Sequence, residues 1–235
     1  MKKRNAWILI TYILMLLSGL IGVPLLLSLG IPMEKIPGIW NVVSFSIGFI
    51  IIMVLLIPEF RTPLYRDERS SMSQTIGWAL AGIPIVFIAQ VVAASIEMNV
   101  FGIEPGSKNT KMIVDLTLSF PLLILVVSVI GPILEEIVFR KVIFGTLYKR
   151  TNFIIAALIS SLVFAVVHRD FSHILIYAAL GFTLSFLYVK TKRLIVPIIA
   201  HVSINSFVML AQVVFRDKIA ELEKQLQSIQ FLFGG

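Results

Sequence analysis

The chain has 235 residues, of which 58% are hydrophobic and 14% are charged, and its mean hydropathy is +0.97. Soluble domains are about half apolar and about a quarter charged, so this composition excludes an ordinary soluble domain and a disordered chain, and the lack of cysteine excludes disulfides, thiolate zinc sites and cysteine nucleophiles. The net charge of +7 comes mostly from basic residues at the edges of apolar blocks, where they hold membrane segments on the cytoplasmic side, so we expect no nucleic-acid partner.

Apolar blocks long enough to cross a membrane begin near the N-terminus. A helix needs about 20 apolar residues to cross the hydrocarbon core. We predict spans over residues 7–29, 39–57 and 75–96. The first is expected to be retained, since no signal-peptide cleavage site follows it. Polar segments follow the second and third spans, at 59–73 and 97–115.

The fourth block, residues 116–148, is mostly apolar but 33 residues long. A single helix of that length would be about 50 Å, longer than a bilayer is thick. We expect either a long helix whose C-terminal half leaves the membrane or two pieces broken near Gly131-Pro132.

Three further spans are predicted, over residues 153–167, 174–189 and 194–215. The tail, 216–235, is charged first and then apolar, and would lie in the interface or contribute to an eighth crossing. The sequence therefore predicts an all-α polytopic membrane protein, a bundle of seven or eight transmembrane helices in a single domain over residues 1–235. No internal repeat is evident.

The basic residues predict the orientation in the membrane. With the N-terminus inside, eleven Lys and Arg residues face the cytoplasm and four face outward, the tail being left out. Cytoplasmic loops carry the excess of Lys and Arg, so we predict a cytoplasmic N-terminus. The cytoplasmic set is Lys2, Lys3, Arg4, Arg61, Arg66, Arg69, Lys149, Arg150, Lys190, Lys192 and Arg193, and the outer set is Lys35, Lys108, Lys111 and Arg169.

Two adjacent glutamates, Glu135 and Glu136, follow nineteen uncharged residues of the fourth block. Glu136 and Arg140 are four apart and can pair on one helix face, whereas Glu135 points about 100° away from that face. An unpaired carboxylate in a membrane cavity is suited to be a general base that acts on water. The alternative is an ion pair at a helix end that snorkels to the interface with Lys141.

Histidines occur in two other apolar blocks. His168 closes one block four residues after Phe164, and a lone histidine there is more often structural. His201 and Asn205 lie one turn apart on the last span, where they could join two helices or stabilise an oxyanion. His173 lies in a polar loop and is expected to be solvated. A base, two histidines and an amide donor on three helices are the groups needed to hydrolyse an amide.

The chain resembles the CPBP family, the Abi or type II CAAX prenyl endopeptidase-like intramembrane proteases. The family pattern is Glu-Glu-x-x-x-Arg, then Phe-x-x-x-His, then His-x-x-x-Asn or Asp, and all three motifs are present at residues 135–140, 164–168 and 201–205. The resemblance covers a core over 116–215, and 1–115 would be variable N-terminal helices. That N-terminal stretch is similar to YdiL-type members from Bacillus.

The resemblance implies a role for each motif residue. Glu135 would activate water, and His168 would help to hold that water. His201 and Asn205 would bind the scissile carbonyl and stabilise the oxyanion in a polar catalytic cavity. A second set would support the site: Glu136, Arg140 and Phe164.

The family has been described both as metalloproteases and as glutamic proteases. We predict a metal-free site without a cofactor, because the chain lacks His-Glu-x-x-His, which places two zinc ligands on one helical turn. The alternative is a zinc ion held by Glu135, His168 and His201, since catalytic zinc usually takes three protein ligands.

The resemblance implies an intramembrane endopeptidase that cleaves near the C-terminus of a lipidated, CAAX-type, or membrane-embedded peptide, in contact with membrane lipid. We expect an integral protein of a bacterial cell membrane whose cavity opens to the cytoplasm, because Lys149-Arg150 ends the helix that carries Glu135. Two alternatives are a proton-coupled transporter, since intramembrane Glu and His form proton relays, and a non-catalytic scaffold or bacteriocin-immunity partner.

Overall fold

The computed structural model describes residues 3–61 and 69–215 and the single positions 218, 221 and 225. Within these residues the chain is helical and contains no strand, which confirms the all-α prediction. The helices in chain order are α1 (Lys3–Leu17), α2 (Gly19–Ser28), α3 (Ile36–Arg61), α4 (Met72–Phe101), α5 (Lys108–Ser119), α6 (Leu123–Leu125), η2 (Val126–Ile130), α7 (Gly131–Glu135), η3 (Glu136–Phe144), α8 (Gly145–Tyr148), α9 (Phe153–Val167), η4 (Phe171–His173), α10 (Ile174–Thr191) and α11 (Ile195–Val214).

Five helical segments among the described residues are long and apolar enough to cross a membrane: Lys3–Ser28, Ile36–Glu59, Met72–Phe101, Phe171–Thr191 and Ile195–Val214. The other two predicted spans correspond to α9, which is shorter, and to the run from α6 to α8. Many large apolar side chains on these helices are exposed, as expected of surfaces that lipid covers. The chain is an integral membrane protein. The predicted eighth crossing falls in 216–235, outside the described residues except for three isolated positions.

The fourth block is divided at a different proline from the one predicted. Helix α5 ends at Ser119, and Phe120 is extended because it precedes Pro121, which disfavours helical geometry at that residue. From Leu123 to Tyr148 the chain is continuously helical, with π-helical turns in η2 and η3. The break expected at Pro132 is absent: the helix continues through this proline, which directly follows the π-helical turn of η2, and local π adjustments allow membrane helices to contain proline.

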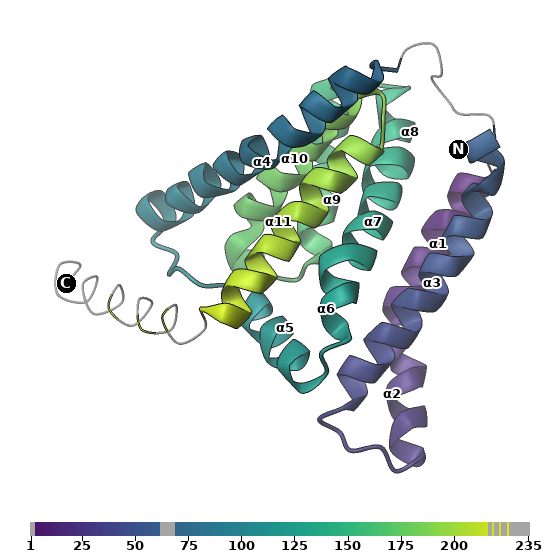
Figure 1. The fold of residues 1–235 in the computed structure, drawn as a ribbon, viewed down its shortest axis with the longest axis vertical. Coiled ribbons are helices and arrows are strands. Elements are labelled where there is room, and N and C mark those ends of the chain that lie inside the picture. The colour runs from purple at the N-terminus through teal and green to yellow at the C-terminus, as the bar shows by residue number, and fades with distance from the viewer. Residues whose placement is uncertain (1–2, 62–68, 216–217, 219–220, 222–224, 226–235) are drawn as a thin grey trace.

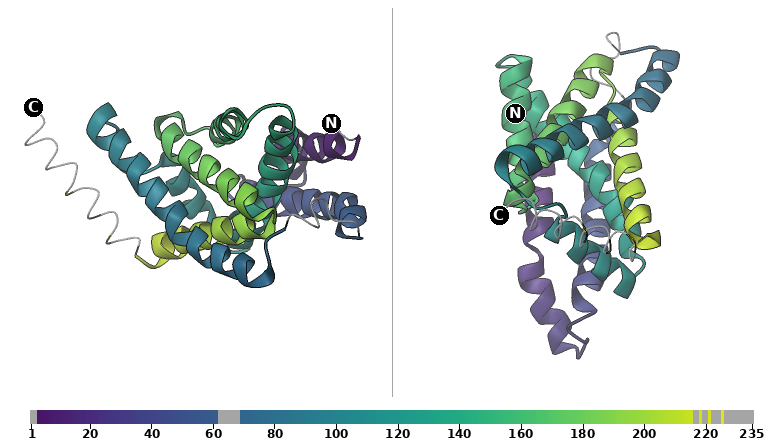
Figure 2. Two further views of the ribbon diagram at one scale, coloured as in Figure 1. Left: turned by 90° about the horizontal axis from the view of Figure 1, so that it is seen from above. Right: turned by 90° about the vertical axis from the view of Figure 1, so that its left-hand side faces the viewer.

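Two groups of helices form the bundle (Figure 1). Helices α1 and α3 are antiparallel neighbours at one side, and α4, α9, α10 and α11 pack together at the other. The run from α6 to α8 lies between the two groups and contacts both, so it occupies the centre (Figures 1 and 2). Tyr12 of α1 meets the ring of Phe139 of η3 edge-on, with centroids 6.0 Å apart.

Small and polar residues allow close packing around this central run. A Cβ atom added to Gly181 of α10 would lie 3.0 Å from the Cα atom of Ser161 on α9, so glycine permits this contact. The buried hydroxyl of Ser160 on α9 donates to the carbonyl of Phe139, 3.0 Å away on η3. Such contacts are typical of membrane helices, which associate through small residues and interhelical hydrogen bonds.

The two ends of the bundle differ in the loops that form them. At one end Arg4 pairs with Glu59 at 2.7 Å, which joins the start of α1 to the end of α3. At this same end, the amide of Ser70 donates to the carbonyl of Thr191 at 3.1 Å. We call it the basic end; its described loops are 69–71, 149–152 and 192–194. The pocket end, opposite, holds the loops at 102–107 and 168–173 and the end of α11.

Candidate active site

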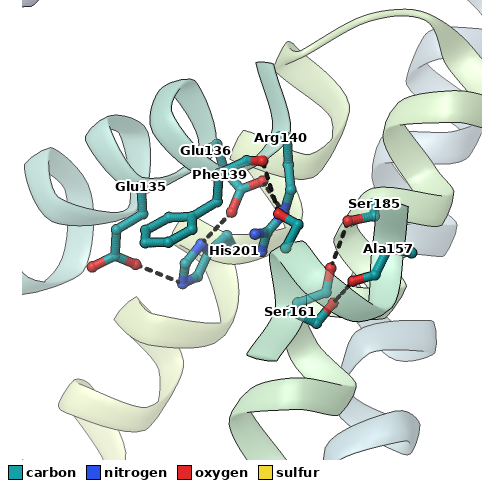
Figure 3. Close-up of polar contacts among 10 residues, drawn as sticks. Glu135, Glu136, Phe139, Arg140, Ala157, Ser161, Ser185 and His201 are labelled. Carbon is teal, nitrogen blue, oxygen red and sulfur yellow. Dashed lines mark hydrogen bonds and ion pairs between the residues drawn. The ribbon is translucent and has the colours of Figure 1, made fainter. Parts of the chain in front are cut away.

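Four motif residues from α7, α9 and α11 line one pocket of about 520 Å³. Glu135 lies at the end of α7, His168 closes α9, and His201 and Asn205 lie one turn apart on α11. Apolar side chains from α5, η2, α10 and α11 complete the wall, so the lining mixes polar and apolar groups rather than being polar throughout. Figure 3 shows the two glutamates, Arg140 and His201.

Glu136 is fully buried and has two partners. One carboxylate oxygen lies 3.0 Å from Nε of Arg140, which confirms the ion pair predicted from the four-residue spacing. The other oxygen lies 2.9 Å from Nδ1 of His201, sixty-five residues away in the sequence. Because a carboxylate accepts, Nδ1 of His201 donates, and the ring is held in one orientation (Figure 3).

Glu135 faces the other nitrogen of the same ring. Its Oε2 atom lies 3.7 Å from Nε2 of His201, and 17% of the side chain is exposed. This oxygen is buried and has no hydrogen-bond partner within the described part of the chain. His201 therefore lies between two carboxylates, one bonded and one free to act on a group that enters the pocket.

Phe164 is the apolar centre of the site. Its ring is fully buried, and the guanidinium carbon of Arg140 lies 4.8 Å from the ring centroid. The same ring meets the imidazole of His201 at 5.9 Å and that of His168 at 4.4 Å between centroids. Phe164 thus contacts one residue of each of the three motifs, including its own.

His168 caps the C-terminus of α9, and its ring is fixed on two sides. Nδ1 lies 2.8 Å from the carbonyl oxygen of Phe164. Since a carbonyl only accepts, Nδ1 carries the hydrogen and Nε2 of the neutral ring is left as an acceptor. The other side stacks on Tyr177 of α10, with ring centroids 4.2 Å apart. Among the described residues His168 makes no hydrogen bond to Glu135, so any link between the two would pass through a bound molecule.

Asn205 presents its amide to the pocket from α11. Its Nδ2 atom lies 3.4 Å from the carbonyl oxygen of Val127 in η2, a long hydrogen bond. One amide hydrogen thus keeps the side chain near the central run, and the second is available to a substrate oxygen.

His173 is buried, and the expectation that it is solvated is wrong. Its Nδ1 atom lies 3.0 Å from Oε2 of Glu97 on α4, and the other oxygen of Glu97 accepts from the amides of Leu175 and Ile176 at 2.9 and 3.2 Å. The carboxylate therefore binds the N-terminus of α10, where helix amides and the helix dipole favour an anion.

Three contacts of the site were not predicted from the sequence: Glu136 with His201, Glu97 with His173, and Tyr177 with His168. Each joins side chains of different helices, and a single sequence carries no signal of which helices are neighbours. The charge of Glu97 near the end of a predicted span was the one available hint, since buried charges in membranes usually have partners.

The pocket lies toward the pocket end, and none of its lining residues belongs to the described loops of the basic end. Gly106 and Ser107, from the loop between α4 and α5, and His168 line it instead. The helix that carries Glu135 runs to Tyr148, next to Lys149-Arg150, but the pocket faces the start of that helix.

The residues of the alternative zinc site do not form a ligand set here. Within residues 3–61 and 69–215, no group of three or more His, Cys, Asp or Glu side chains is arranged to hold a metal ion. Glu135 and His201 approach each other at 3.7 Å, and Nδ1 of each histidine donates to Glu136 or to a backbone carbonyl, as histidines that bind a metal through Nε2 also do. The metal-free site stays a prediction.

Comparison with known proteins finds one matching family model and related proteins that match most or all of the chain. A family model described as type II CAAX prenyl endopeptidase Rce1-like matches residues 117–207. YdiL of Bacillus subtilis (strain 168), named as a membrane peptidase, is 42% identical over 244 residues, which span all of this chain and 99% of that protein. MroQ of Staphylococcus aureus (strain USA300), named as a membrane-embedded CAAX protease, is 38% identical over 189 residues, 78% of this chain and 76% of that protein. No solved structure matches the chain.

Proposed function

Because this chain belongs to the Rce1-like family of type II CAAX prenyl endopeptidases and is a membrane protease, we propose that it hydrolyses a peptide bond near the C-terminus of a lipidated, CAAX-type, or membrane-embedded peptide. The observation that carries the proposal is the pair of carboxylates around His201. Glu136 bonds one ring nitrogen at 2.9 Å, and the free carboxylate of Glu135 lies 3.7 Å from the other.

In the proposed first step Glu135 acts as a general base on a water molecule. The carboxylate removes a proton from the water while the water oxygen forms a bond to the carbonyl carbon of the substrate. His168 supports the water, because its Nε2 atom is an acceptor for the second hydrogen while Nδ1 donates to the backbone. The apolar wall of the pocket keeps other water away, which strengthens these polar interactions.

The charge that develops on the carbonyl oxygen is bound by His201 and Asn205. The amide of Asn205 donates one hydrogen, and the doubly protonated imidazole of His201, which Glu136 orients through Nδ1, donates from Nε2. The intermediate then collapses, the carbon–nitrogen bond breaks, and Glu135 returns its proton to the leaving amine. The products are one free carboxylate and one free amine.

Glu136, Arg140 and Phe164 support the site without touching the reacting atoms. The Glu136 carboxylate orients His201, the Arg140 charge compensates that carboxylate, and the Phe164 ring packs against both histidines. The site is proposed to work without a metal. It is proposed to lie in a bacterial cell membrane, where the chain would meet its peptide substrate in lipid.

The proposal is tested by cleavage of a quenched fluorescent farnesylated CAAX-type peptide and of an unlipidated membrane-embedded peptide by the full chain in detergent. We expect Glu135→Gln to lower kcat by about 10²- to 10⁴-fold, the contribution of a general base. His168→Ala and His201→Ala should also lose turnover. Glu34→Gln is the matched control, since Glu34 is exposed and outside the pocket, and it should cleave like the wild type.

Each variant is first checked by size-exclusion chromatography and circular dichroism, so that loss of turnover is not loss of fold. The mechanism would be contradicted if all three pocket variants cleaved the peptide at the wild-type rate. Failure of the wild type to cleave either peptide would contradict the proposed substrate class.

A further inference from the structure

The distribution of basic residues distinguishes the two ends of the bundle. Nine of the described Lys and Arg residues belong to the basic end and four to the pocket end, and two further basic residues stand in the sequence before α1 and between α3 and α4. Three more basic residues follow α11 in the sequence, so the pocket end would have seven basic residues at most. Because Lys and Arg near the ends of spans are retained in the cytoplasm, this excess favours a cytoplasmic basic end.

The described residues that line the pocket come from the half of the bundle next to the pocket end. The lining of α10 comes from its first turns, up to Leu180, and that of α11 comes from His201 onward. The loop residues Gly106 and Ser107 lie at its rim. Water for hydrolysis must enter from the side on which these loops lie.

A second cavity, of about 1020 Å³, continues the pocket at the same end. The two cavities share five wall residues: Asn41, Phe45, Asn109, Met112 and His168. The larger cavity is bounded by exposed apolar side chains of α1, such as Leu16 and Leu17, which would face lipid, and by the polar loop that holds Arg169. A peptide with an apolar segment can therefore reach His168 from the membrane and the adjacent water at this end.

We infer that the active site opens on the face of the membrane away from the cytoplasm, and that its substrate is a peptide presented on that face. A translocation reaction that carries the peptide across the membrane must then precede cleavage. A peptide synthesised in the cytoplasm stays intact until export delivers it, and hydrolysis releases the products on the outer side. The inference rests on the proposed function for the reaction, but its geometry is independent of catalysis.

Cysteine labelling in intact cells tests the opening directly, because the natural chain contains no cysteine and a single introduced thiol is the only target. Ser172→Cys marks the pocket end and Thr151→Cys the basic end, and both positions are exposed. With a membrane-impermeant maleimide we expect Ser172→Cys to be labelled in intact cells and Thr151→Cys only after permeabilisation. Glu104→Cys, in the loop before α5, is a second marker of the pocket end and should behave as Ser172→Cys does.

Labelling of Thr151→Cys in intact cells, or protection of both pocket-end thiols until permeabilisation, would overturn the inference. A measurement of peptide cleavage then separates the inferred opening from the proposed function. A farnesylated CAAX-type peptide that cannot cross the membrane should be cleaved outside right-side-out vesicles, and inverted vesicles should lose this cleavage until detergent is added. If labelling follows the expected pattern and Glu135→Gln cleaves like the wild type, the proposed mechanism fails while the inferred opening stands.

Discussion

The buried ion pair between Glu136 and Arg140 leads to a prediction about stability. Both side chains have no exposed surface, and within the described residues Glu136 is the single ion-pair partner of Arg140. Glu136→Gln leaves the guanidinium uncompensated, and removal of one partner of a buried pair lowers the free energy of unfolding by about 3–5 kcal/mol. Arg140→Met should lower the free energy of unfolding by about 3 kcal/mol, the lower end of this range, because His201 still donates to the remaining carboxylate of Glu136.

The double variant, Glu136→Gln with Arg140→Met, should recover much of this loss, since it leaves no unpaired charge. We expect a coupling free energy of about 2 kcal/mol or more between the two positions. The assay is unfolding by sodium dodecyl sulfate in mixed micelles, followed by fluorescence of the three tryptophans and by circular dichroism.

A partly exposed pair provides the control. Arg4 is 27% exposed beside Glu59, which also has Lys141 at 2.7 Å, so Arg4→Gln should lower the free energy of unfolding by less than about 1 kcal/mol. Losses at positions 136 and 140 that add to within about 0.5 kcal/mol would refute the reasoning, because independent sites are additive.

Gly181→Ala should lower the free energy of unfolding by about 1–3 kcal/mol in the same assay, because the added Cβ atom would lie 3.0 Å from the backbone of α9. The control is Gly77→Ala, which should be neutral or stabilising because an added Cβ atom there has no neighbour within 4 Å. Tyr177→Leu removes the ring stacked on His168 and should lower kcat about two- to tenfold with an unchanged KM. Tyr177→Phe keeps the ring and should retain the wild-type rate, and an equal loss of kcat in both variants would contradict a role for stacking. Asn205→Ala should lower kcat by about 10²-fold or more if the amide binds the oxyanion, which single-turnover cleavage of the peptide measures, and an unchanged rate would remove Asn205 from the mechanism.

Relations within one helix could be predicted because the helical repeat determines which side chains are neighbours. The four-residue spacing of Glu136 and Arg140 predicted their ion pair, and the spacing of His201 and Asn205 predicted that both face one side of α11. The long apolar blocks predicted the membrane spans for the same reason, since length and hydropathy are local properties.

Relations between helices could not be predicted from this one chain. The hydrogen bond from His201 to Glu136 spans sixty-five residues, and that from His173 to Glu97 spans seventy-six. Nothing local distinguishes a histidine that will meet a buried carboxylate from one in a solvated loop, which is why the expectation for His173 was wrong. The place of the pocket along the bundle could not be predicted either, because the basic residues mark the end of a helix and give no indication of where a cavity lies along it.

The activation of water by Glu135 without a metal is tested by cleavage of the farnesylated CAAX-type peptide by the wild type and by Glu135→Gln, each with and without a zinc chelator. We expect wild-type turnover that the chelator leaves unchanged and that Glu135→Gln lowers by about 10²-fold or more. Wild-type turnover that the chelator abolishes and added zinc restores would contradict it, and so would a Glu135→Gln variant that cleaves at the wild-type rate.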